Sequence, residues 1–98
     1  MKIYQGDRTI DGVVVEVDGA ELPPHREVHQ FSDAAFEWGY EGAAATQLAL
    51  ALIYDHSGDA GLAQRMAAPF MALVTANFGN DWELTSQDIE LALTQLAA

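Results

Sequence analysis

Three histidines and one short run of polar residues are the side chains whose types could do chemistry in this chain. His25 and His29 lie four positions apart, the spacing that two ligands of one metal have on a helix. Pro23 and Pro24 directly precede them and favour extended backbone, in which residues four apart lie too far from each other to share a metal. We therefore interpret His25 and His29 as surface histidines and predict no metal site.

The run Asp55-His56-Ser57-Gly58-Asp59 holds the three residue types of a hydrolytic triad. A catalytic triad is assembled from separate elements, not from one helix end, and the run lacks the alternating carboxylates and distal glutamate of a calcium loop. It is typical of a junction between two helices, in which His56 suits a helix C-terminus, Gly58 ends that helix and Asp59 caps the next. Nothing in this run indicates catalysis.

The two glycines before the first predicted helix, Gly39 and Gly42, do not indicate a phosphate loop, because Glu41 between them would repel a phosphate. The chain also lacks cysteine, which excludes disulfides and thiolate zinc sites. We predict that the protein is not an enzyme and needs no cofactor.

Acidic residues dominate the charged residues of the chain. Fifteen Asp and Glu against four Lys and Arg give 98 residues a net charge of −11, which excludes a basic nucleic-acid-binding footprint. With 50% apolar residues, the chain is not a disordered acidic tail. An acidic surface can dock on a basic protein surface, including one that holds a nucleic-acid backbone, or it can simply confer solubility. The carboxylates that we predict to contact a partner are Asp7, Asp11, Glu16, Asp18, Glu21, Glu37 and Glu41.

Aromatic residues form the second candidate contact region. Phe36, Trp38 and Tyr40 are spaced by two, so in an extended segment they would share one side. Such a cluster either covers the open end of a small core or serves as a platform for a ligand or partner. Trp38 and Tyr40 therefore join the predicted partner-binding residues.

The N-terminal third reads as β-structure. Asp11-Gly12 is a turn signal between residues 2–10 and 13–18, which together predict an antiparallel hairpin. In the second run Val13, Val15 and Val17 share one face, while Val14, Glu16 and Asp18 share the other. We expect a third short strand over residues 28–31 and an edge strand over residues 82–84.

The remainder reads as helical. We predict one helix over residues 43–56, a second over about 60–78 that Pro69 either kinks or ends near residue 68, and a third capped by Thr85 or Ser86. The fold class is α+β, with an N-terminal antiparallel hairpin or small sheet packed against about three C-terminal helices in a single domain of residues 1–98. The longest apolar stretch, residues 48–54, is too short for a membrane span, and the start is not a signal peptide, so we expect a cytoplasmic protein.

The runs Tyr4-Gln5-Gly6-Asp7-Arg8 and Phe36-Glu37-Trp38-Gly39-Tyr40-Glu41-Gly42, followed by a Gln-Leu-Ala-rich helix, carry a resemblance that extends over nearly the whole chain. The chain resembles a small family of domains of unknown function carried by phages, plasmids and other mobile elements. The resemblance implies no activity. Where relatives often have Gly-Ser-Gly-Pro, this chain has Gly42-Ala43-Ala44-Ala45, which argues against a ligand loop there. The similar residues either form a shared site or hold the hairpin to the first helix.

Small size, negative charge, absent catalytic groups and this resemblance together predict a binding protein of a phage or mobile element. It would inhibit a host defence component, in the manner of an anti-CRISPR protein, through an acidic surface that competes with nucleic acid. The expected partner is a host protein that handles nucleic acid, with no direct binding to nucleic acid or to a membrane. The alternative is an accessory module that forms a homodimer or binds a small ligand through residues 36–40.

Overall fold

The computed structural model describes residues 1–97 and contains a four-stranded antiparallel sheet. Its strands are β1 (Ile3–Thr9), β2 (Gly12–Val17), β3 (Ala20–Glu21) and β4 (Trp82–Thr85), in the order β3-β2-β1-β4. β1 and β2 form the predicted hairpin, with Thr9 opposite Gly12 at the turn. β4 is the predicted edge strand, added beside β1 from the far end of the chain.

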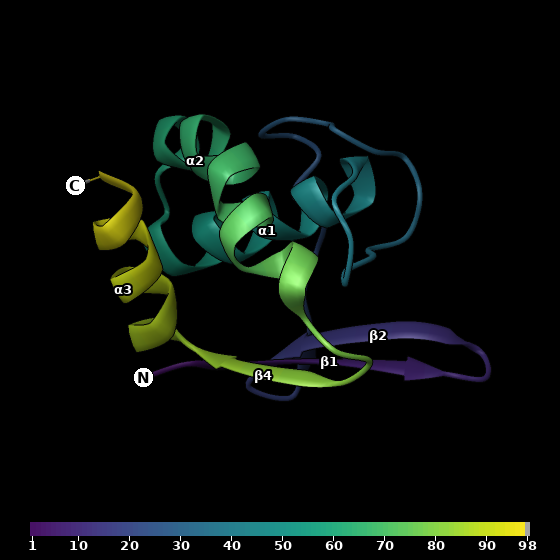
Figure 1. Cartoon of the computed structure of the whole chain (residues 1–98). Helices are drawn as coiled ribbons and strands as arrows, with labels where there is room; N and C mark the ends of the chain where they lie inside the picture. The colour runs from purple at the N-terminus through teal and green to yellow at the C-terminus, as the bar shows by residue number, and fades with distance from the viewer. Residues whose placement is uncertain (98) are drawn as a thin grey trace.

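Three α-helices lie on one side of this sheet, as Figure 1 shows: α1 (Ala43–Ser57), α2 (Ala60–Leu73) and α3 (Ser86–Ala97). This arrangement confirms the predicted α+β class. α1 is the central helix, and its residues 45–53 are all buried, as expected for a helix that is apolar almost all round. Within residues 1–97, no helix is both long and apolar enough to cross a membrane.

Helix boundaries follow local capping chemistry. Gly58 adopts the left-handed conformation with φ 68° and ends α1, and the Asp59 side chain accepts a hydrogen bond from the Leu62 N–H at the start of α2. Both capping predictions are confirmed. α2 continues through Pro69 and ends at Leu73, so the predicted end at residue 78 is wrong; a short 3-10 turn, η1 (Thr75–Asn77), follows it.

The segment between β3 and α1 is ordered without being a strand, so the prediction of a strand over residues 28–31 is wrong. The reason is Gln47, whose fully buried side chain on α1 satisfies the backbone of this segment. Its Oε1 accepts from the Phe31 and Ser32 N–H groups, and its Nε2 donates to the carbonyls of Pro24 and His29. With these groups bonded to a helix side chain, the segment pairs with no strand.

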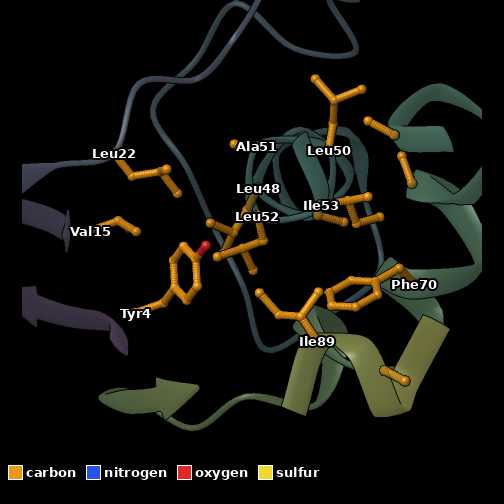
Figure 2. Close-up of a cluster of buried hydrophobic side chains, with 14 of the residues drawn as sticks. Tyr4, Val15, Leu22, Leu48, Leu50, Ala51, Leu52, Ile53, Phe70 and Ile89 are labelled. Atoms are coloured by element: carbon orange, nitrogen blue, oxygen red, sulfur yellow. The ribbon is translucent and has the colours of Figure 1, made fainter. Parts of the chain in front are cut away.

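The hydrophobic core lies between the sheet and α1 and continues beneath α2 and α3. Figure 2 shows Tyr4, Val15 and Leu22 reaching from the β-region toward Leu48 and Leu52 of α1. On the opposite side of α1, Phe70 and Ile89 complete the same cluster. One face of the sheet is therefore buried against helices, and no helix or strand of the described residues covers the other face (Figure 1).

Candidate docking surface: the open face of the sheet

Strand register decides which side chains share the open face. Successive residues of a strand point to opposite faces, and directly paired residues point to the same face. Tyr4 is buried among the helices, so its neighbours Gln5 and Ile3 point away from them, as does Asp7. Gln5 is paired with Glu16 on β2 and with Glu83 on β4.

The pairing produces an acidic row across all four strands. Glu21 pairs with Glu16, Glu16 with Gln5, and Gln5 with Glu83. The Gln5 Nε2 donates to the Glu83 Oε1 at 3.0 Å. Asp7 lies in the neighbouring row of the same face, opposite Val14. We call the set Gln5, Asp7, Glu16, Glu21 and Glu83 the acidic face.

An open hollow of about 470 Å³ lies over this face. Gln5, Asp7, Glu16 and Glu83 line it, and Asp81 adds a further carboxylate at its rim. Val14, which is 45% exposed, provides apolar surface in the same hollow. Carboxylates around a small apolar area suit the side chains of lysine and arginine, which combine an aliphatic stem with a charged end.

Three of the four basic side chains are engaged elsewhere, and the fourth, Arg65, is exposed on α2. Lys2 pairs with Asp55 at the end of α1, and Arg8 pairs with Glu37 on the helix side of the sheet. Arg26 donates to the carbonyls of Ser32 and Ala34 in the long segment before α1. Among the described residues, 1–97, no ion pair involves a member of the acidic face. Its charge is therefore uncompensated within the described fold.

The structure divides the predicted contact carboxylates between several places. Asp7, Glu16 and Glu21 belong to the acidic face, and Asp11 is exposed at the hairpin turn. Asp18 does not share a strand face with Glu16 as predicted. It lies in the turn after β2 with φ 50°, and its Oδ1 accepts from the Ile3 N–H at 2.9 Å.

The other two predicted carboxylates lie outside the sheet. Glu37 is in the ion pair with Arg8, and Glu41 is exposed on the segment that leads into α1. Sequence reasoning missed Glu83, although a signal was present. Trp82 is large and apolar, and in the predicted strand 82–84 the residue after it had to point to the opposite face.

The predicted aromatic platform is not assembled. Trp38 is fully buried and lies edge-on to Trp82, with ring centroids 5.7 Å apart, so it belongs to the core, the first of the two alternatives for this cluster. Phe78 stacks on the Trp82 ring, with ring centroids 4.3 Å apart. Tyr40 is 56% exposed, and Phe36 is half-buried. Burial explains the difference, because the largest ring of the run is needed to close the core.

The residues of the Tyr-x-Gly-x-Arg start all point toward the helices, and each has a structural partner. The Tyr4 hydroxyl donates to Asp55 Oδ2 at 2.7 Å; burial, followed by this bond to a carboxylate, raises the pKa of Tyr4. A Cβ on Gly6 would lie 2.3 Å from the indole of Trp82. Arg8 covers the Trp38 ring at 4.9 Å and donates to its carbonyl. These residues hold the hairpin to the helical layer.

The histidines have separate partners. His25 bonds to Glu27, which lowers the pKa of that carboxyl, and His29 lies against Phe31. His56 contacts Glu90 at 2.7 Å and thereby links the end of α1 to α3. Within the part of the chain that the structure describes, no group of three or more His, Asp or Glu side chains is arranged to hold a metal ion.

Comparison with known proteins identifies a family whose function is unknown. No curated protein and no solved structure matches the chain. Residues 4–95 match a family described as a family of unknown function, DUF6166. The matched range includes the hairpin from Tyr4 onward, the three helices up to residue 95 and every member of the acidic face. The chain belongs to the DUF6166 family.

Proposed function

We propose that this protein binds a basic surface of a protein that handles nucleic acid, and that it does so with the acidic face of its sheet. The observation that carries the proposal is the row Glu21, Glu16, Gln5 and Glu83, which crosses four strands and forms no ion pair with a basic side chain among residues 1–97. A rigid surface with charge of one sign attracts a surface of the opposite sign and speeds their association. Bound there, the acidic face competes with the nucleic-acid backbone.

The spacing of the carboxylates supports this reading. Neighbouring strands lie about 4.8 Å apart, so Glu16 and the facing Glu21 lie well within the Debye length of about 8 Å at physiological salt. Glu83 lies two strands from Glu16, about 10 Å away across the uncharged Gln5, so its potential adds to theirs more weakly. The sheet also holds these groups in place through its backbone ladder, so little order has to be acquired on binding.

The biological setting that we propose is a phage or another mobile element, on the resemblance of the Tyr4–Arg8 and Phe36–Gly42 runs to small proteins of such elements. The inhibited partner is then a defence component in the host cytoplasm, and the protein acts in the manner of an anti-CRISPR inhibitor. The alternative, a dimerising or ligand-binding module that uses residues 36–40, has less support because Trp38 is buried.

The experiment starts with capture of partners from host lysate by the tagged protein, washed at low and high salt. Each captured nucleic-acid-binding protein is then purified and tested for displacement of a fluorescent nucleic acid. The decisive variant is Glu16→Lys with Glu83→Lys, which reverses two charges of the row. Its matched control is Asp33→Lys with Glu41→Lys, which makes the same charge change at exposed positions of the segment before α1.

Displacement by the wild type and the control, but not by the acidic-face variant, is the expected result. Displacement that weakens steeply as salt rises agrees with it, because exposed charges are screened. Equal activity of the two double variants contradicts the proposal and leaves only a general effect of net charge.

A further inference from the structure

The outer edge of β2 is only half covered by β3. β3 pairs with Glu16 and Val17, and the Leu22 N–H donates to the Val15 carbonyl at 3.0 Å. Alternate residues of a strand direct their backbone groups to the same side, so the N–H and C=O of Val13 point to this same outer edge. No strand of the described chain, residues 1–97, pairs with Val13 on that side. An unpaired strand edge is a template for another extended chain.

A second hollow, of about 210 Å³, lies beside this free edge. Its apolar wall includes Val13 and Val15 of β2 together with Leu22, Pro24 and Phe36 of the following segment. Arg26 also lines it, but its guanidinium already donates to two backbone carbonyls. The hollow is therefore an apolar pocket placed where a side chain of an added strand would enter.

We propose that the free edge of β2 binds an extended segment of a partner protein, which adds to the sheet as a further strand and places an apolar side chain in the hollow. The backbone groups of Val13 require an extended occupant, and the wall requires an apolar side chain. This site lies at the edge of the sheet and does not depend on competition with nucleic acid at the acidic face.

Charge defines the rest of the occupant. Glu21 lines the hollow, Glu16 is its neighbour across the β2–β3 pair, and Asp11 is exposed at the hairpin turn. A segment in which apolar residues alternate with lysine or arginine is therefore complementary to the edge. A second copy of this chain is less suitable, because edge-to-edge pairing would bring these carboxylates against each other.

The test uses the full chain labelled with 15N and the probe peptide acetyl-Lys-Ile-Lys-Ile-Lys-Ile-amide. Two peptides of the same length are the comparison probes: one has proline in place of the central isoleucine, and the other has glutamate in place of each lysine. We expect the first peptide to shift the Val13 amide resonance and to slow its hydrogen exchange, and the proline and glutamate peptides to bind at least about tenfold more weakly.

Two variants test the two halves of the site. Val13→Pro removes the outward N–H and keeps the bonds to β1, since that N–H points away from β1. Ala35→Trp fills the hollow from an exposed position, and Ala68→Trp on the exposed side of α2 is its control. Thermal unfolding shows that each variant is folded, and we expect Val13→Pro and Ala35→Trp each to weaken the peptide at least about tenfold.

Three results overturn the inference. If Ala35→Trp does not weaken binding of the lysine peptide, the hollow is excluded as the binding site. Equal binding of the proline peptide, with shifts confined to Glu16 and Glu83, shows electrostatic attraction to the acidic face, which would leave the proposed function standing. A dimer in sedimentation that Val13→Pro dissociates would assign the edge to a second copy of the chain.

Discussion

The two faces of the sheet differ in how far their polar side chains have partners of opposite charge or hydrogen-bonding partners. On the helix side, Tyr4 bonds to Asp55, and Arg8 bonds to Glu37 and lies over Trp38. On the acidic face, Glu16 and Glu21 stand opposite each other, and neither forms an ion pair with a basic side chain in the described part of the chain. The contacts of Tyr4 and Arg8 are explained by the fold, because each of these two side chains has a partner whose loss would cost stability. The facing carboxylates lower stability, since like charges directly opposite are unfavourable, and this is the kind of feature that binding explains.

The largest effect on the stability of the fold is expected at Gly6. Gly6→Ala places a methyl group 2.3 Å from the indole of Trp82, so the ring or strand β1 must move. We expect a loss of about 3 kcal/mol in the free energy of unfolding, measured by urea titration. Asp7→Ala, one position along on the acidic face, is the matched control and should change stability by less than about 0.5 kcal/mol. Equal losses for the two variants would remove the distinction between the faces.

Next comes Tyr4. Tyr4→Phe removes the hydrogen bond to Asp55, and we expect a loss of about 1.5 kcal/mol at neutral pH in the same titration. The control on the other face is Gln5→Ala, which removes an exposed bond to Glu83 and should cost less.

Tyr4 also makes stability depend on pH in the alkaline range. Its pKa is raised in the folded protein, so the folded state keeps a proton that the unfolded chain loses above about pH 10. The unfolded state then binds fewer protons, and the free energy of unfolding falls as pH rises, by up to about 1.4 kcal/mol per pH unit from this group. In Tyr4→Phe this part of the slope should vanish; a slope that persists unchanged would assign it to other groups.

A smaller effect is expected at Arg8. Its contacts are partly exposed, so Arg8→Ala should lower the free energy of unfolding by about 1 kcal/mol through the lost contact with the Trp38 ring and with Glu37. Arg8→Lys keeps the charge but not the planar group over the ring, and should recover only part of the loss. Full recovery would indicate that charge alone matters here. Binding through the acidic face should remain unchanged in folded Arg8 variants.

The smallest expected effect on stability is a gain, at Glu16. Glu16→Gln relieves the repulsion from Glu21 and should raise the free energy of unfolding by about 0.3 kcal/mol while it weakens binding to a basic partner. Thermal unfolding at low salt gives the best sensitivity, because salt screens the repulsion. A gain in stability without a loss of binding would place the partner away from the acidic face.

Local sequence signals predicted the elements well where one residue type dictates the backbone. The Asp11-Gly12 turn located the hairpin, and Gly58 and Asp59 located the junction between α1 and α2. The segment 28–31 was misread because its alternation is weak and its backbone bonds go to Gln47, a helix residue 15 or more positions away. No local pattern contains that partner.

For the candidate site too, local sequence signals predict some features and long-range contacts decide the others. Composition and alternation alone establish the negative charge, the absence of cysteine and the placement of Glu16 on the face of β2 opposite to Val13, Val15 and Val17. The pairing of β4 with β1, which brings Glu83 into the row, the turn that removes Asp18 from it and the burial of Trp38 follow from packing between distant segments. Alternation and capping act between neighbours in the chain, whereas strand order and burial depend on contacts between residues far apart, and those are set by how the whole core packs.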